Sequence, residues 1–223
     1  MLEEAGAQPP EFFAAEIVKQ LPRFRLQLGD QEVRSLSRYL AEVDLWRRRT
    51  NLTGPLSGED LVSHSLESAF GGKLIAHGAR VIDIGSGAGL PGIPLAIADS
   101  SLILSLLEPR GLRAAFLRHA VQTVPVKNAD VVEGRIEKIS GKNYDVATTR
   151  ALGNIRRLMG KADFLVAGGA LLSWTTEPQA LGRSLDRAFS LEKVEEIPES
   201  RRRVVALFRL RRPLDAAGWS KRP

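Results

Sequence analysis

The sequence has no cysteine and no long apolar run. Without cysteine the chain cannot form disulfides, thiolate metal sites or a covalent cysteine nucleophile, which suits a reducing cytoplasm. No apolar stretch approaches the roughly 20 residues that a membrane-spanning helix needs, and the acidic start lacks the positive and apolar regions of a signal peptide. We therefore expect a cytoplasmic protein that does not cross a membrane.

Histidine is scarce as well, since the chain has only His64, His77 and His119. His77 and His119 have no partners at metal-ligand spacing, so we expect no metal site. His64 lies on an expected helix, where a histidine is more often a hydrogen-bonded packing residue than a catalyst. Contact with RNA is the alternative role for His64.

The length and composition fit one full-sized domain with a small appendage. The chain has 223 residues, of which 43% are hydrophobic and 26% charged, so it can form a substantial core. We expect a helical N-terminal cap over residues 1–56, a Rossmann-like domain over 57–212 and a basic tail over 213–223.

The net charge of +6 is concentrated at the end of the chain. From Glu199 onward there are eight basic and two acidic residues, whereas the charges before it balance. Arg201, Arg202 and Arg203 begin this basic stretch, and Arg47 to Arg49 form a smaller cluster. Basic clusters suit phosphate binding, because each contact releases condensed counterions. A solvated tail that aids solubility is the simpler alternative, but the second cluster favours a nucleic acid.

The apolar pattern changes near residue 78. Before it, apolar residues recur every three or four positions, which predicts helices over 11–20, 31–49 and 58–70, the last capped by Ser57. After it, strands are expected at 80–84, 102–107, 130–133, 144–148, 170–174, 191–195 and 204–209, and helices at 91–99, 111–122, 153–166 and 178–188. This alternation indicates an α/β fold with a doubly wound, mostly parallel sheet. A hairpin connection over 196–203 predicts an antiparallel last strand at the end of the sheet.

A glycine-rich turn, VIDIGSGAGLPG over residues 81–92, follows the first of these strands. Asp83-x-Gly85-x-Gly87-x-Gly89 fits an S-adenosylmethionine loop, while Gly87-x-Gly89-x-x-Gly92 also matches the dinucleotide pattern. The dinucleotide pattern should begin where the strand ends, yet two residues intervene. Asp83 would repel a pyrophosphate, whereas the ammonium and sulfonium of the methyl donor would be attracted to it. The turn therefore predicts an S-adenosylmethionine site.

Two later strand ends carry further cofactor candidates. Glu108 ends the second strand, where an acidic residue can accept hydrogen bonds from ribose hydroxyls. Ile136 and Glu137 follow the third strand, where backbone groups would flank an adenine. That second assignment depends on topology alone.

The chain resembles the RsmG (GidB) family of bacterial small-subunit rRNA guanine-N7 methyltransferases. The resemblance covers roughly residues 36–210 and depends on VIDIGSGAGLPGIPLAI, the upstream RRRTNLTG, HSLES from His64, and DVATTRALG. It implies a Rossmann-like class I S-adenosylmethionine-dependent methyltransferase fold with seven strands, S-adenosylmethionine as cofactor, and a guanine of 16S rRNA as acceptor. The implied cofactor residues are Gly85, Gly87, Gly89, Leu90, Glu108, Ile136, Glu137 and Arg150, with Arg150 reaching the cofactor or the RNA.

The resemblance is incomplete at three places. Glu67 stands where the family usually has aspartate, SWTTEP replaces a usual Lys-Gly pair near Thr175, and the basic tail is longer than expected. The resemblance also implies that Asn51 and Thr53 lie on the active-site face, although either residue could instead cap a helix.

The absence of a base or nucleophile agrees with this chemistry. Guanine N7 has an unprotonated lone pair, so proximity and alignment suffice and no catalytic base is expected. Cytosine-C5 transfer would need a thiolate, and exocyclic-amine transfer usually shows an Asn-Pro-Pro-Tyr-type turn where this chain has TTRA. An arginine on guanine O6 and N7 would occupy the attacking lone pair. Arg150 is therefore predicted to bind the cofactor carboxylate or a phosphate.

Two alternative functions stay open at this point. One is a nicotinamide-dependent oxidoreductase, and the other is a non-catalytic RNA-binding factor for ribosome assembly. For the methyltransferase, the expected partner is 16S rRNA or the small ribosomal subunit, and the protein is expected to act as a monomer.

Overall fold

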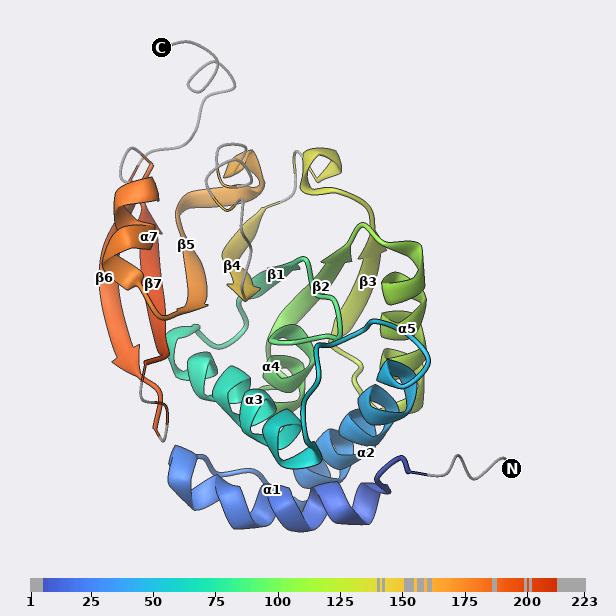
Figure 1. Ribbon diagram of the computed structural model, residues 1–223. Helices are drawn as coiled ribbons and strands as arrows, with labels where there is room; N and C mark the ends of the chain where they lie inside the picture. The colour runs from blue at the N-terminus through green and yellow to red at the C-terminus, as the bar shows by residue number, and fades with distance from the viewer. Residues whose placement is uncertain are drawn as a thin grey trace.

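Seven strands form one sheet, and three N-terminal helices gather on one side of it (Figure 1). The computed structural model describes residues 6–139, 141, 143–150, 155, 159, 162–185, 188–198, 200 and 202–211. Arg201 and the basic tail expected over 213–223 lie outside the described residues. No helix in the described ranges is long and apolar enough to cross a membrane.

The N-terminal helices are α1 (Pro10–Phe24), α2 (Asp30–Arg47) and α3 (Gly58–Phe70), followed by the short 3-10 helix η1 (Gly71–Leu74). They confirm the three predicted helices. Ser57 caps α3 as expected: its hydroxyl accepts a hydrogen bond from the Asp60 amide at 3.0 Å. The Asp60 carboxylate in turn accepts from the Ser57 amide at 3.0 Å, so two amides at the start of the helix are satisfied.

The sheet has the strand order β3-β2-β1-β4-β5-β7-β6. Its strands are β1 (Arg80–Ile84), β2 (Ile103–Glu108), β3 (Ala129–Glu133), β4 (Tyr144–Arg150), β5 (Leu165–Thr175), β6 (Phe189–Glu196) and β7 (Val204–Leu210). The other helices are α4 (Gly92–Ala98), α5 (Gly111–Thr123) and α7 (Pro178–Leu185), with the 3-10 helices η2 (Ile136–Lys138) and η3 (Ala162–Phe164). Strands β1 to β5 pair in parallel, which confirms the doubly wound class.

The last strand differs in place from the prediction. β7 is antiparallel, as expected, but it lies between β5 and β6, so β6 forms the edge of the sheet. The burial of the two strands explains this order. Most of β7 is buried, whereas the middle of β6 is exposed, so the more apolar strand takes the interior position.

The helix expected over 153–166 falls largely outside the described residues. Its expected end is wrong, because 162–164 form η3 and β5 already begins at Leu165. β5 is thus longer than the predicted strand over 170–174.

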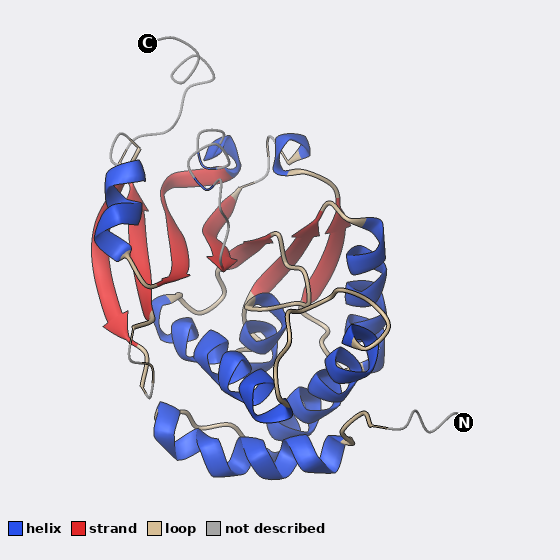
Figure 2. Ribbon diagram, viewed as in Figure 1, coloured by secondary structure: helices blue, strands red, loops and turns tan. Residues whose placement is uncertain are grey.

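Two apolar cores pack on opposite faces of the sheet. The first joins α1 to α3 with the sheet and includes Phe13, Leu61 and Val81. The second includes Ile82 and Phe208. Neighbouring residues 81 and 82 point to opposite faces, as strand geometry requires. Figure 2 shows α1, α2 and α3 together on one side of the sheet, so the N-terminal helices share a core with it.

Candidate cofactor and nucleic-acid site

The glycine-rich loop lies at the carboxyl end of the central strands. β1 pairs with β2 and with β4, and its last residues, Asp83 and Ile84, lie beside Thr148 and Leu107. The loop then leads into α4, which begins at Gly92. In open α/β sheets, ligands bind in the crevice outside the carboxyl ends of the strands.

The loop backbone takes conformations that favour glycine. Gly85, Gly87 and Gly89 have φ angles of 74°, 56° and 93°. A side chain at Gly89 is also excluded by space, because a Cβ there would lie 2.6 Å from Ile93 Cδ1. The loop therefore presents a surface without side chains at these three positions.

The residue under the loop is Tyr39 of α2, which the sequence did not single out. Its hydroxyl donates a hydrogen bond to the Ala88 carbonyl at 2.7 Å, and its side chain is fully buried. The feature of the sequence that could have identified Tyr39 is its place on the apolar face of an amphipathic helix. Through this contact the N-terminal helices position the glycine loop.

Asp83 supports the loop from inside the protein. It is 1% exposed, one carboxylate oxygen accepts from the Thr148 hydroxyl at 2.9 Å, and the other accepts from the Gly92 amide at 3.3 Å. Burial raises the pKa of Asp83 to about 6. Both oxygens are engaged by the protein's own donors, so the expected contact with a donor ammonium stays a prediction.

Glu108 is brought directly against the loop. Its Oε2 accepts a hydrogen bond from the Gly87 amide at 2.9 Å, and its Oε1 accepts from the Arg110 amide at 3.0 Å. Each carboxylate oxygen has further lone-pair capacity, so the group can still accept hydrogen bonds from a ligand. The predicted pairing of the loop with an acidic strand end is present in the structure.

The remaining cofactor candidates lie in different surroundings. Ile136 begins η2 and its side chain is buried in the second core, while Glu137 is exposed. Leu90 is partly buried against the first core. For Ile136, only backbone groups are available to a ligand, as the sequence interpretation supposed.

Arg150 is held by α3. Its guanidinium donates to the Glu67 carboxylate at 2.8 Å and to the His64 carbonyl at 3.0 Å. Arg203, just before β7, donates to the other Glu67 oxygen at 2.6 Å and contacts His64 Nε2 at 3.0 Å. These four residues form a cluster, which we call the Glu67 cluster, between α3 and the ends of β4 and β7. Sequence reasoning treated Glu67 only as a departure from the family pattern.

The Glu67 cluster is strongly perturbed by burial. Burial raises the pKa of Glu67, and the charges of Arg150 and Arg203 oppose that rise. Burial and the same two arginines lower the pKa of His64 to about 4, so His64 is neutral near pH 7. The cluster makes a packing role for His64 the better supported of the two predictions.

Asn51 and Thr53 lie in the segment between α2 and α3. The Asn51 carbonyl accepts a hydrogen bond from Arg113 at 2.9 Å, and the Thr53 hydroxyl donates to the Gly54 carbonyl at 3.0 Å. Neither caps a helix, since Ser57 caps α3, so the capping alternative is wrong. Arg113 Nη1 would lie 3.7 Å from a Cβ at Gly87, which places this segment beside the glycine loop. Whether Asn51 and Thr53 contact substrate stays a prediction.

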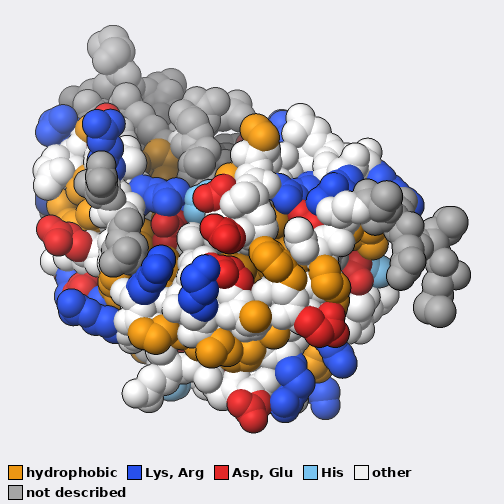
Figure 3. All heavy atoms as spheres, turned by 60° about the horizontal axis from the view of Figure 1, so that its bottom comes forward, with side chains coloured by type: hydrophobic (Ala, Val, Ile, Leu, Met, Phe, Trp, Pro, Cys, Tyr) orange, Lys and Arg blue, Asp and Glu red, His pale blue; other side chains and the backbone are white. Residues whose placement is uncertain are grey.

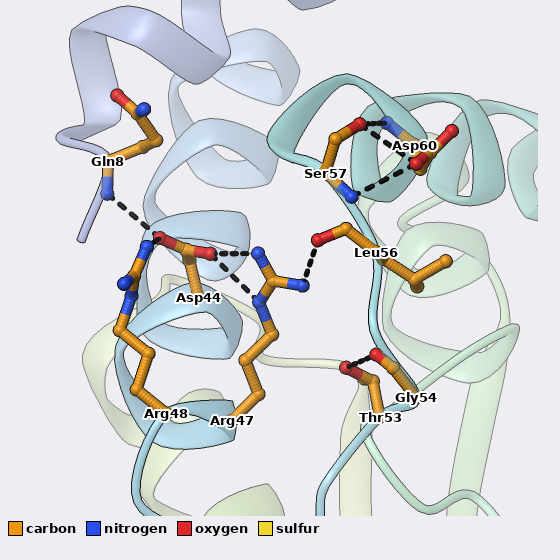
Figure 4. A network of polar contacts seen from close by, with 9 residues as sticks. All are labelled: Gln8, Asp44, Arg47, Arg48, Thr53, Gly54, Leu56, Ser57 and Asp60. Carbon is orange, nitrogen blue, oxygen red and sulfur yellow. Dashed lines mark hydrogen bonds and ion pairs between the residues drawn. The ribbon is translucent and has the colours of Figure 1, made fainter. Parts of the chain in front are cut away.

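Two arginines of the smaller basic cluster, Arg47 and Arg48, bond to a buried acid (Figure 4). Asp44 of α2 is fully buried and accepts hydrogen bonds from Arg47, from Arg48 and from the Gln8 amide. Arg47 also donates to the Leu56 carbonyl. Burial alone would raise the pKa of Asp44, but these three donors hold it below its usual value. Arg47 thus ties α2 to the segment before α3, whereas Arg48 is exposed and pairs with Asp44 of its own helix.

Within the described ranges, no group of three or more His, Asp or Glu side chains could hold a metal ion. His119 pairs with Glu42 at 2.8 Å, and His77 pairs with Asp99 at 3.2 Å. Two buried hydroxyls next to the Glu67 cluster in sequence, those of Ser65 and Thr149, have no hydrogen-bond partner among the described residues.

Known structures are similar to this chain in fold. A SAM-dependent methyltransferase from Aquifex aeolicus matches with a TM-score of 0.51 and 14% identity over 61% of this chain and 84% of that one. TYW2 of M. jannaschii, solved in complex with AdoMet, matches with a TM-score of 0.51 and 15% identity over 66% of this chain and 76% of that one. The fold is that of a class I S-adenosylmethionine-dependent methyltransferase, as expected.

Sequence comparison identifies the family. The family model GidB, rRNA small subunit methyltransferase G, matches residues 32–196. The ribosomal RNA small subunit methyltransferase G of Chromobacterium violaceum is 35% identical over 69% of this chain and 74% of the relative. That of Alteromonas mediterranea is 30% identical over 82% of both chains. The chain belongs to the rRNA small subunit methyltransferase G family, which confirms the predicted family and enzyme class.

Proposed function

We propose that this protein transfers a methyl group from S-adenosylmethionine to N7 of a guanine in 16S rRNA. The observation that supports this most directly is the hydrogen bond between Glu108 and the Gly87 amide. It places an acidic acceptor against a side-chain-free loop at the carboxyl edge of the sheet. The names of the relatives supply the substrate, small-subunit ribosomal RNA.

The residues present fit the proposed cofactor. Gly85, Gly87 and Gly89 have positive φ angles and no side chains, so a ligand can approach the loop backbone closely. Glu108 keeps acceptor capacity for ribose hydroxyls. Leu90 and the backbone at Ile136 and Glu137 complete the proposed cofactor residues. When bound, S-adenosylmethionine supplies an activated, electrophilic methyl group.

The chain's own groups need only position the acceptor. Guanine N7 attacks with an existing lone pair, so no protein group has to remove a proton first. His64 is neutral and hydrogen-bonded to Arg203, and Arg150 is neutralised by Glu67, so neither is set up as a free acid or base. We propose that the Glu67 cluster orients Arg150 at the edge of the site, where its remaining donors can contact the cofactor carboxylate or a phosphate.

The test is methyl transfer from labelled S-adenosylmethionine to protein-free 16S rRNA and to small subunits, followed by mapping of N7-methylguanine. We expect label at one guanine with the wild-type protein and strongly reduced label with Glu108→Ala. Glu133→Gln is the matched control, because Glu133 lies opposite Glu108 in the sheet register but ends the next strand. RNA binding without transfer would point to the assembly factor, and saturable NADH binding to the oxidoreductase.

We further propose that the enzyme acts as a monomer in the cytoplasm. The support for the location is chemical: small-subunit rRNA is the proposed substrate, and cysteine is absent from the sequence. Sedimentation of the purified protein over a range of concentrations tests the monomer, and fractionation of cells tests the location.

A further inference from the structure

A second hollow lies away from the glycine loop, between the end of α1 and the β6–β7 hairpin. It is a cavity of about 790 Å³ lined by four cationic and two acidic side chains, besides apolar ones. The charged residues are Arg25, Lys73, Arg202, Arg203, Glu195 and Glu196. We call this hollow the hairpin cleft. In Figure 1 the end of α1 lies close to the ends of β6 and β7.

Three of the six charged residues in the hairpin cleft, Lys73, Glu195 and Arg203, are already paired. Lys73 donates to Glu195 at 2.6 Å, and Lys193 approaches the same carboxylate at 3.0 Å. Arg203 is bound to Glu67. Arg25 and Arg202 are both exposed, and their side chains make no hydrogen bond or ion pair with the residues that the structure describes. Two guanidiniums are therefore available to an anionic ligand.

The backbone of Arg25 is held in place at the end of α1. Arg25 ends α1 in the left-handed conformation, with φ 54°, and its amide bonds to the Pro22 carbonyl at 3.2 Å. Arg202 lies in the opposite wall, two residues before β7 begins. Two arginines 177 positions apart in the sequence thus face one cleft. Because guanidinium forks match phosphate oxygens, such a pair suits a phosphodiester.

The hairpin cleft is connected to the proposed methylation site. Val204 pairs with Thr175, and Trp174 pairs with Arg150, so the start of β7 lies at the same edge of the sheet as the end of β4. Glu67 bonds to both Arg203, which lines the cleft, and Arg150. An RNA strand bound in the hairpin cleft would therefore run toward the carboxyl ends of the parallel β-strands, where the glycine loop lies.

The surface around the hairpin cleft carries charges of both signs. Such a surface favours binding through a few local contacts over attraction by a broad field of one sign. On the face that carries α1, Lys and Arg side chains alternate with acidic and apolar ones (Figure 3). Glu196 is exposed in the cleft and would repel a phosphate. Affinity at this place must then depend on a few individual residues, which makes it testable by single substitutions.

We propose that the hairpin cleft binds the phosphodiester backbone of the substrate RNA beside the target guanine, through Arg25 and Arg202. This inference builds on the proposed function. It adds α1 to the RNA interface, which the basic clusters of the sequence did not indicate. It also assigns Glu196 as a residue that weakens binding.

The experiment measures binding of protein-free 16S rRNA as a function of salt. Each lost phosphate contact should reduce the slope of log K against log salt by about 0.7 to 0.9 and weaken binding roughly fivefold near 0.15 M salt. We expect this for Arg25→Gln and for Arg202→Gln, and about twice the change in slope for the double variant. Glu196→Gln should bind more tightly than the wild type. Arg34→Gln, an exposed arginine of α2 that bonds to Gln31, is the matched control and should change nothing.

The outcomes separate the two proposals. Each variant must bind S-adenosylmethionine like the wild type, which establishes that it is folded. If the wild type binds and methylates RNA but the Arg25 and Arg202 variants keep its salt slope, the cleft proposal is wrong and the function stands. If the wild type neither binds nor methylates rRNA, both are wrong. If the variants lose binding to a ribosomal protein of the small subunit and not to RNA, an acidic protein segment occupies the cleft instead.

Discussion

The Glu108 carboxylate at the end of β2 accepts a hydrogen bond from the Gly87 backbone amide, 2.9 Å away. Two segments that are separate in the sequence thereby form one surface, with the acidic group fixed against the loop. Only 3% of Glu108 is exposed, so its position is set by the protein before any ligand arrives. This prior placement is what a ribose-binding acceptor requires.

Glu108→Gln should weaken S-adenosylmethionine binding by about tenfold to a hundredfold. The physical reason is the loss of charge-assisted hydrogen bonds, which are worth about 1.5–3 kcal/mol. Calorimetric titration measures the change. Glu133→Gln serves as the control, because Glu133 is an exposed strand-end acid whose partner is Arg118. Equal affinities for the two variants would remove Glu108 from the cofactor site.

Gly89→Ala should lose cofactor binding and destabilise the loop by about 1–3 kcal/mol. The new Cβ would meet Ile93 at 2.6 Å and the Tyr39 hydroxyl at 3.2 Å, on a backbone with φ of 93°. Gly54→Ala is the control, since a Cβ there meets nothing within 4 Å. Urea unfolding and donor titration of both variants test this. A stable Gly89→Ala that binds normally would show that the loop can move aside.

The order of helices and strands was predictable because burial imposes period 2 on strands and period 3.6 on helices. Strand 80–84 and helix 58–70 were predicted to the residue. The position of β7 was not, because a hairpin can add to a sheet through either of its strands. The choice depended on which strand is buried on both faces, and that is a property of the assembled sheet.

Local motifs predicted part of the site, and long-range pairing decided the rest. The glycine loop and Glu108 follow strands directly, so their meeting was predictable from topology. The Glu67 cluster joins residues 64, 67, 150 and 203, and no spacing rule connects them. Likewise, the Arg47 to Arg49 run resembled a phosphate-binding patch until Asp44, three positions earlier on the helix, was found fully buried beneath Arg47.

Asp83 should make stability depend on pH between about 4 and 6. Burial raises its pKa from 3.8 to about 6 in the folded state. A raised pKa means that the contribution of Asp83 to stability is fully present below the unfolded value and is lost as pH rises through the folded value. The stability lost is about 3 kcal/mol, because each unit of pKa difference between the folded and unfolded states corresponds to about 1.4 kcal/mol. The unfolding free energy of the wild type minus that of Asp83→Asn should fall by this amount between about pH 3 and pH 7. A difference that is flat, or that rises with pH, would contradict this prediction.

The opposite sign is expected at Asp60. The Ser57 amide and hydroxyl lower the pKa of Asp60, so its contribution is present above the unfolded value and is lost as pH falls through the folded one. Asp60→Asn should therefore differ from the wild type at neutral pH and converge with it as pH falls below the lowered pKa of Asp60 in the folded state.

Arg47→Ala should lower stability without changing the salt dependence of RNA binding. The substitution removes hydrogen bonds to the buried Asp44 and to the Leu56 carbonyl, at about 1–3 kcal/mol. Urea unfolding measures the first effect and the rRNA salt titration the second. Arg34→Ala, on an exposed face of the same helix, should stay within about 0.5 kcal/mol. A reduced salt slope for Arg47→Ala would return this arginine to the RNA interface.

Glu67→Ala should be the most damaging substitution near the site. It leaves the largely buried guanidinium of Arg150 without its counter-charge, and Arg203 loses the same partner. Breaking a buried pair in this way costs about 3–5 kcal/mol. Chemical denaturation measures the loss. If Glu67→Ala were as stable as the wild type, the Glu67 cluster would contribute nothing to the stability of the fold.

Glu67→Asp separates positioning from folding. The shorter side chain keeps the charge, so Arg150 and Arg203 keep a counter-charge and stability should fall less than in Glu67→Ala. Arg150 would shift, because its bond to Glu67 is 2.8 Å long and Trp174 fixes the backbone there through a 2.8 Å hydrogen bond to the Glu67 carbonyl. A misplacement of about 1 Å can slow a reaction roughly a hundredfold. We expect kcat for methyl transfer to fall while the donor affinity is unchanged, and an unaltered kcat would show that the Glu67 cluster only stabilises the fold.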